Sequence, residues 1–205
     1  MNQKTFYLCG MLVPVVYIFM YFLGGALRPG YSQIAHSVSE LLAPGSPNKS
    51  LLDIINLSFA LLYLLFGIGI FRFVLGSEHN ALIGRIGAGL IIAVGIASIG
   101  SAIFPQDTTG TPATLPGILH IIFVFAVQIP GAILSTLLIG IWTHRTGLFP
   151  GFGTYSFISA GVIVLTGVLA GPSMGKPFMG LVERVSALAV HQWVFVFAWT
   201  LLRRS

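Results

Sequence analysis

Six long apolar runs dominate the pattern of hydrophobic and polar positions along the chain. Each run is close to the roughly 20 residues that cross a bilayer core as a helix. A lone strand in hydrocarbon would leave its amide and carbonyl groups unpaired, so each run must be helical. We therefore predict an all-α integral membrane bundle of six transmembrane helices in one domain, residues 1–205, with spans near residues 6–27, 51–75, 82–104, 117–142, 152–171 and 185–202.

Composition supports a membrane protein and excludes other classes. Hydrophobic residues make up 56% of the chain and charged residues only 7%, against roughly a quarter charged in a soluble domain. The formal charge of +5 comes from singly scattered bases, so nucleic acid is not an expected partner. Cys9 is the only cysteine, which excludes an intrachain disulfide and a cysteine metal site.

An even number of spans puts both termini on one side of the membrane. Six bases lie near that side and four near the other, namely Lys4, Arg72, Arg85, Arg145, Arg203 and Arg204 against Arg28, Lys49, Lys176 and Arg184. Cytoplasmic loops carry the excess of Lys and Arg in membrane proteins. The count predicts a multi-pass cell-membrane protein with cytoplasmic N- and C-termini.

Small residues and prolines indicate how the helices pack. Gly89, Ala93, Ala97 and Ser101 recur at intervals of four, a ridge that lets a neighbouring helix approach closely. We expect the third span, which carries this ridge, at the centre of the bundle. Pro14 and Pro130 lie inside apolar runs and should kink the first and fourth spans.

The acidic residues gather on the predicted outer side. Four of the five acids are there, namely Glu40, Asp53, Asp107 and Glu183. Of the histidines, His36 lies in the first outer loop, and His120 and His191 lie inside the fourth and sixth spans. Ionisable groups within a membrane are costly and usually face a cavity or a partner. Each residue alone has a simpler explanation, because polar residues collect at helix ends.

The first outer loop allows two interpretations. Between Gln33 and Leu42 the polar and apolar residues fall on opposite helix faces, which predicts a short amphipathic interfacial helix. Ser37, Ser39 and Glu40 also match the pattern of a capping box, in which the serine and glutamate side chains have only a structural role. The sequence pattern fits the interfacial helix and the capping box equally well.

Two pairs of residues suggest chemistry at the outer helix ends. Asp107 follows the third span and His120 begins the fourth, so the carboxylate could orient the imidazole as a general base. Arg184 and His191 are seven residues apart and share one helix face, which lets them line one cavity. A metal site would need His36, Asp107, His120 and His191 from separate helices, and no strong metal motif or cofactor signature is present.

Several short motifs occur in a familiar order. They are Ala26-Leu27-Arg28-Pro29-Gly30-Tyr31, Ser37 to Leu41, Pro44 to Asn48, Ile103 to Asp107, Leu119-His120 and Gly180 to Arg184. Together they resemble the bacterial and archaeal membrane family known as domain of unknown function 998 (DUF998). The resemblance covers nearly the whole chain. It implies a polytopic membrane protein without an assigned activity, and its landmarks are Arg28, Glu40, Asp107, His120, Glu183 and Arg184.

The favoured function is an outward-facing polar pocket that binds a membrane lipid or another amphiphile, with Arg28 or Arg184 contacting an anionic group. The enzymatic version is a lipid-directed hydrolase or transferase in which His120 is the base, Asp107 orients it, and Glu40 or Glu183 holds a metal or water. The alternatives are a small transporter, or a subunit that stabilises a larger complex by binding another membrane protein or a second copy. Few polar residues join the outer cluster to the other side, which disfavours transport of a charged solute.

Overall fold

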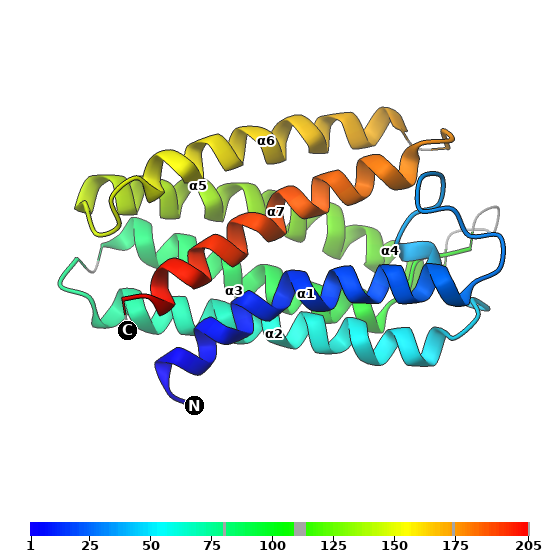
Figure 1. The fold of residues 1–205 in the computed structure, drawn as a ribbon, viewed down its shortest axis with the longest axis horizontal. Coiled ribbons are helices and arrows are strands. Elements are labelled where there is room, and N and C mark those ends of the chain that lie inside the picture. The colour runs from blue at the N-terminus through cyan, green and yellow to red at the C-terminus, as the bar shows by residue number, and fades with distance from the viewer. Residues whose placement is uncertain (80, 109–113, 174, 205) are drawn as a thin grey trace.

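The computed structural model describes residues 1–79, 81–108, 114–173 and 175–204, and its regular elements are helical (Figure 1). Six of its helical segments are long and apolar enough to cross a membrane. The predicted all-α, six-span class is confirmed. The elements are α1 (Gln3–Leu27), η1 (Ser39–Leu41), α2 (Lys49–Gly76), α3 (Leu82–Ile103), α4 (Leu115–Ile121), η2 (Ile122–Gln128), α5 (Ile129–Thr146), α6 (Phe152–Ser173) and α7 (Met179–Leu202).

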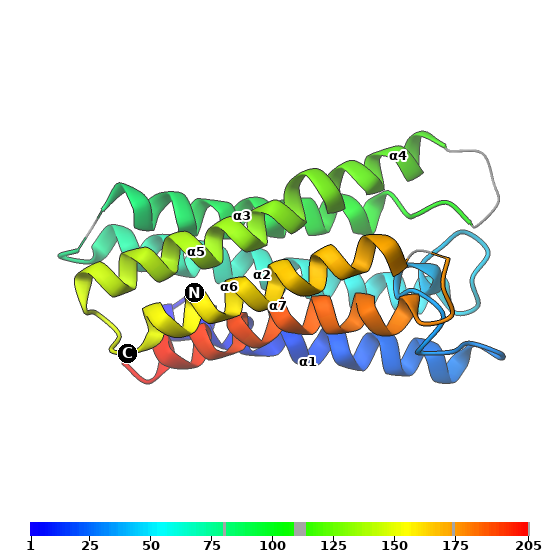
Figure 2. The ribbon, with the colours of Figure 1, turned by 90° about the horizontal axis from the view of Figure 1, so that it is seen from above.

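The helices form a closed ring in chain order. Neighbouring helices pack in the order α1, α2, α3, α5, α6 and α7, and α7 packs against α1 to close the ring (Figures 1 and 2). Helices α4, η2 and α5 run on as one span, Leu115–Thr146. Both termini lie at one end of the bundle (Figure 1). We call that end proximal and the opposite end, which carries the loop between α1 and α2, distal.

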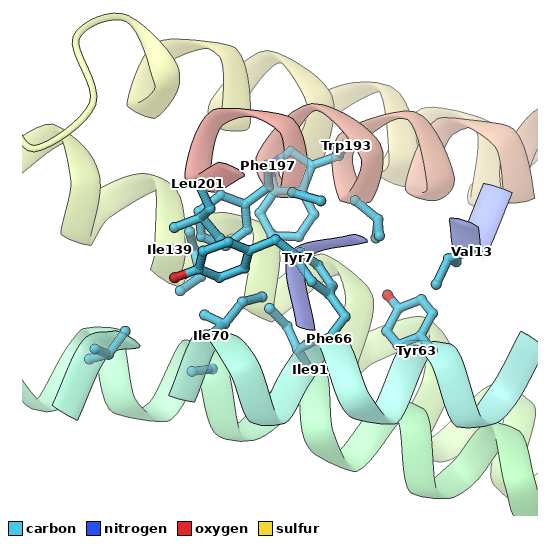
Figure 3. Close-up of a cluster of buried hydrophobic side chains, with 14 of the residues drawn as sticks. Tyr7, Val13, Tyr63, Phe66, Ile70, Ile91, Ile139, Trp193, Phe197 and Leu201 are labelled. Carbon is cyan, nitrogen blue, oxygen red and sulfur yellow. The ribbon is translucent and has the colours of Figure 1, made fainter. Parts of the chain in front are cut away.

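Side chains pointing into the ring make the main core, which includes large aromatic residues (Figure 3). Phe66 of α2 and Phe197 of α7 are fully buried, with ring centroids 6.1 Å apart. Because lipid is as apolar as these side chains, the stabilisation comes from close van der Waals packing and a few hydrogen bonds. One such bond runs from the Trp193 indole to the Ser156 hydroxyl, 2.9 Å away.

Glycines let α2 and α3 approach with their backbones almost in contact. A Cβ added to Gly95 would lie 2.6 Å from the Cα of Leu64, and one on Gly67 would lie 2.9 Å from the amide nitrogen of Ile92. The predicted ridge is used only in part, because Gly89 has no atom within 4 Å of its Cβ position. The third span is therefore one member of the ring, packed between α2 and α5, and not its centre.

The irregular part of the fourth span precedes Pro130. Proline lacks the N–H that would bond the carbonyl four residues earlier, and its ring crowds that carbonyl. Residues Ile122–Gln128 form a π-helix, which widens the turn just before the proline. From this helix, the Gln128 amide donates to the carbonyl of Ala97 at 3.1 Å and to the hydroxyl of Ser101 at 2.9 Å. The expected irregularity at Pro130 is thus tied to α3.

Two predicted boundaries change at the distal end. The sixth span begins at Met179 rather than near residue 185, which puts Glu183 and Arg184 inside α7. The interfacial helix expected between residues 33 and 42 is reduced to the 3-10 turn Ser39–Leu41. Leu41 is 1% exposed, so the apolar side of this turn packs on the protein and not on lipid.

Packing between α2 and α3 gives a paired prediction. Gly95→Ala should lower the free energy of unfolding by about 1–3 kcal/mol, because the added methyl overpacks the contact with Leu64. Gly89→Ala is the matched control, and it should raise stability by about 0.5–1 kcal/mol because alanine favours the helix at an open position. Thermal unfolding in detergent measures both. Equal tolerance of the two substitutions would contradict this close approach.

Candidate functional site

The loop between α1 and α2 is pinned to the distal end by Arg184 of α7. The Nη1 atom of Arg184 lies 2.8 Å from the carbonyl oxygen of Gln33, 2.9 Å from that of His36 and 2.8 Å from that of Gly180. Gly180 has to be a glycine, because a Cβ there would collide with the His36 carbonyl. Next to it, the Leu181 amide donates to the carbonyl of Ile34 at 2.9 Å.

Tyrosines complete the surroundings of the guanidinium of Arg184, a residue that is 5% exposed. Its carbon Cζ lies 5.2 Å from the ring centroid of Tyr21 and 5.7 Å from that of Tyr31, within reach of cation–π attraction. Its Nη2 donates to the Tyr31 hydroxyl at 2.6 Å, which in turn donates to the Ser37 carbonyl at 2.7 Å. Burial raises the pKa of Tyr31 to about 12, so the phenol keeps the proton that it donates.

Carboxylates organise the same loop through its amide groups. A carboxylate oxygen of Glu183 accepts from the Val38 amide at 3.1 Å. The Glu40 carboxylate accepts from the Ser37 amide at 3.1 Å, while the Glu40 amide donates to the Ser37 hydroxyl at 3.3 Å. This reciprocal pair is a capping box. The structural interpretation of Ser37 and Glu40 is therefore the one observed, and the Ser39 hydroxyl donates to that of Ser37 at 3.4 Å.

A cavity of about 250 Å³ lies where this loop meets the segment after α3. The loop and that segment are joined by a hydrogen bond, in which the Thr108 hydroxyl donates to the carbonyl of Pro44 at 3.3 Å. Its wall includes three of the predicted site residues, Arg28, Glu40 and Asp107. The Arg28 guanidinium donates to the Glu40 carbonyl at 2.8 Å and lies 5.6 Å from the Tyr31 ring centroid. The remainder of the wall is Ala43, Pro44, Gly45, Ser46, Pro47 and Thr108.

Asp107 is held in the cavity wall by the N-cap of α4. Its carboxylate accepts from the Thr114 hydroxyl at 2.6 Å and from the Thr114 amide at 2.8 Å. The same hydroxyl caps α4 by accepting from the Gly117 amide at 3.2 Å. These two hydrogen bonds lower the pKa of Asp107 below its ordinary value of 3.8, so the carboxylate is charged at neutral pH.

His120 is directed at α3 and not at Asp107. Its Nδ1 lies 2.9 Å from the carbonyl oxygen of Phe104 and 3.2 Å from that of Ser101. Since a carbonyl only accepts, Nδ1 is the donor in both contacts. No hydrogen bond joins Asp107 to His120 within the described ranges. The oriented pair that an acid–base site would need is thus not formed, and the catalytic roles stay a prediction.

The remaining candidates lie apart from the cavity. His36 accepts from the Ser32 amide through Nδ1 at 3.0 Å. Asp53 forms an ion pair of 2.6 Å with Lys49 one turn away on α2. His191 lies halfway along α7, against the ring of Tyr17, with the two ring centroids 4.5 Å apart. Within the described part of the chain, no three His, Cys, Asp or Glu side chains are grouped as a metal site.

The predicted residues thus separate by role. Arg28, Glu40 and Asp107 line the cavity. Glu183 and Arg184 instead bond from α7 to the backbone of the loop between α1 and α2. Sequence reasoning missed Tyr31, Gln33 and Thr114 as partners of these charges. Tyr31 ends the first recognised motif, which was a usable signal. Gln33 gives no comparable signal, because a backbone carbonyl bonds equally well from any residue type. Thr114 does give one, because its hydroxyl caps α4 and threonine is a common N-cap residue.

Arg184→Lys tests the arginine contacts. A lysine ammonium cannot reach the carbonyls and the Tyr31 hydroxyl together, so we expect a loss of about 1.5–3 kcal/mol in unfolding free energy, the scale of a hydrogen bond to a charged group. Hydrogen exchange at the Leu181 and Val38 amides should also become faster. Arg85→Lys, at an exposed position at the proximal end of α3, is the control. An unchanged exchange pattern in Arg184→Lys would contradict the role.

Comparison with known proteins identifies the family but no activity. The family model described as protein of unknown function (DUF998) matches residues 11–200. No curated protein and no solved structure matches the chain. The matched range runs from the first turns of α1 almost to the end of α7, and so includes all six spans and the distal loops. The chain therefore belongs to the DUF998 family of proteins of unknown function.

Proposed function

We propose that this polytopic membrane protein binds the headgroup of a zwitterionic membrane lipid in the distal cavity. The observation that carries the proposal is the pair of opposite charges, Arg28 and Asp107, in the wall of one cavity at the distal end of the bundle. Its volume of about 250 Å³ is below the range of roughly 300–1,000 Å³ for drug-sized ligands. A headgroup whose acyl chains remain in the bilayer is a suitable occupant.

Arg28 is the better of the two arginines for a ligand phosphate. A guanidinium has five N–H donors in a planar fork that matches phosphate oxygens. Arg28 has one hydrogen-bonded acceptor among the described residues, the Glu40 carbonyl. Arg184 instead directs both terminal nitrogens, Nη1 and Nη2, at three carbonyls and a hydroxyl of the protein, and its remaining donor, Nε, is buried. Spare donors beside a cavity favour Arg28 as the phosphate contact.

Asp107 suits the cationic half of the headgroup. Its carboxylate is ionised at neutral pH and accepts two hydrogen bonds from Thr114, whereas two carboxylate oxygens offer about four acceptor sites. An ammonium group can use the remaining sites. Glu40 adds a second formal negative charge to the wall, so the balance of one base and two acids disfavours a ligand with only negative charge.

Binding is favoured over catalysis and transport by the same contacts. The predicted base and its predicted orienting carboxylate bond to different partners, His120 to α3 carbonyls and Asp107 to Thr114. The core that fills the proximal half of the ring is apolar, which offers no route for a charged solute. A headgroup site needs neither a base nor a route.

The proposed orientation places the distal cavity on the outer face of the cell membrane, with both termini in the cytoplasm. A reporter active only outside the cytoplasm should give signal when inserted at Gly110 and none when fused after Ser205, two positions outside the described residues. The physical basis is the excess of Lys and Arg near the termini. The opposite pattern of signals would reverse the orientation.

Lipid selectivity tests the site. Short-chain phosphatidylethanolamine at a hundred times its Kd should raise the free energy of unfolding of the purified protein by about 2.7 kcal/mol. Phosphatidylcholine and phosphatidylglycerol at the same concentration should raise it less. The ethanolamine ammonium donates hydrogen bonds, which choline cannot do. Arg28→Gln and Asp107→Asn should each weaken binding about 10-fold or more. Asp53→Asn, outside the cavity, should bind as the parent does, and equal effects of all three lipids would refute the proposal.

The pH dependence has a definite sign. Because the pKa of Asp107 is lowered from 3.8, its contribution to ammonium binding is fully present above that value and is lost as pH falls through the lower pKa of the folded protein. Affinity for phosphatidylethanolamine should therefore be constant from pH 7 to about pH 4.5. A decline in affinity between pH 7 and about pH 4.5 would contradict the role given to Asp107.

A further inference from the structure

A second hollow lies far from the distal cavity, on the surface between α1 and α7. It has a volume of about 370 Å³ and is lined mainly by apolar side chains, namely Pro14, Val15, Ile18, Leu188, Phe195 and Val196. His191 and Gln192 are the polar residues in its wall. Val15 is 53% exposed, so the groove opens to the lipid-facing surface of the bundle.

The groove lies near the middle of the bilayer. His191 stands halfway along the 24 residues of α7, about 18 Å from either end at 1.5 Å per residue. The hydrocarbon core is about 30 Å thick. The ester and phosphate oxygens of a phospholipid remain at the interfaces, about 15 Å from this depth. Water is absent from the bilayer core. Neither these lipid oxygens nor water can therefore serve as a partner for His191.

His191 has unmet hydrogen-bonding capacity. Its side chain is 6% exposed, and its buried Nδ1 has no partner in the described structure. Gln192 beside it is satisfied, since its amide donates to the Ser159 hydroxyl at 3.1 Å and accepts from the Tyr155 hydroxyl. A buried imidazole without partners costs free energy in hydrocarbon. The polar atom that the groove leaves unmatched is therefore on His191.

Packing alone does not explain a histidine here. Its ring makes edge contacts with Tyr17, at a centroid distance of 4.5 Å, and with Phe59, at 5.4 Å. A phenylalanine would make the same aromatic contacts without burying unpaired nitrogens. The imidazole gains only if something in the groove hydrogen-bonds to it.

We propose that the groove between α1 and α7 binds a lipid-soluble molecule whose hydrocarbon skeleton carries a hydrogen-bonding oxygen, and that His191 meets that oxygen. A phenol or quinone ring on an aliphatic chain has this chemistry, because its chain fits the apolar walls and its oxygen travels with the ring to the centre of the bilayer. This site is independent of the headgroup site at the distal end.

Three matched probes test the proposal on the full chain in lipid nanodiscs: a benzoquinone with a decyl chain, 4-decylphenol and decylbenzene. At least one of the oxygen-bearing probes should bind about tenfold more tightly than decylbenzene, the ratio that one neutral hydrogen bond supplies. His191→Phe should abolish this preference while keeping the ring contacts. His144→Phe, at an exposed histidine at the proximal end of α5, should keep it.

Leu188→Trp fills the groove without altering His191 and should weaken all three probes, so it tests the same site if His191→Phe folds poorly. Three results would overturn the proposal. One is equal affinity of the parent for all three probes, which indicates an apolar slot only. Another is an oxygen preference that survives His191→Phe, or probe affinities that Leu188→Trp leaves unchanged. The third is dissociation of a dimer by Leu188→Trp with no probe effect, which would make the groove a contact between copies.

Discussion

A loop at the edge of hydrocarbon must satisfy its backbone carbonyls from within the protein, and in this chain a buried arginine does so. Arg184 bonds three carbonyls and the Tyr31 hydroxyl, and water can supply no equivalent deep in the bundle. The same contacts offset much of the cost of burying the cation, because they supply acceptors to both Nη atoms. Together with the bonds from Leu181 to Ile34 and from Val38 to Glu183, they hold the loop against the start of α7.

The closed ring makes those loop contacts possible. Because α7 returns to α1, the start of the last helix lies beside the end of the first, and residues far apart in sequence become neighbours. Arg184 then stacks over Tyr21 of α1, and His191 packs on Tyr17, one turn earlier on α1. Glycines such as Gly95 and Gly180 permit the close approach of α3 to α2 and of α7 to the distal loop, because any side chain there would meet a backbone atom.

Sequence reasoning recovers the spans and the charged residues, and fails on their partners. Runs of apolar residues identify six helices because hydrocarbon permits little else. Asp107 and His120 lie close in sequence, yet they do not bond to each other. His120 bonds to the Phe104 carbonyl and Asp107 to the Thr114 hydroxyl. Short-range competitors of this kind are invisible to spacing arguments. The start of α7 was misplaced because Glu183 and Arg184 look like a helix boundary when their loop partners are unknown.

Arg28 and Arg184 at the distal end differ in how many of their N–H groups bond to the protein, and this difference separates a structural role from a ligand-binding one. Both are conspicuous charges in a chain with few, and the sequence treats them as equivalent anion contacts. Arg184 is enclosed and its fork is directed at the protein, so its replacement should affect folding first. Arg28 lies beside a cavity with one acceptor, so its replacement removes little structure. A charged side chain with few hydrogen bonds to the protein, in the wall of a cavity, indicates a ligand site better than burial or charge alone.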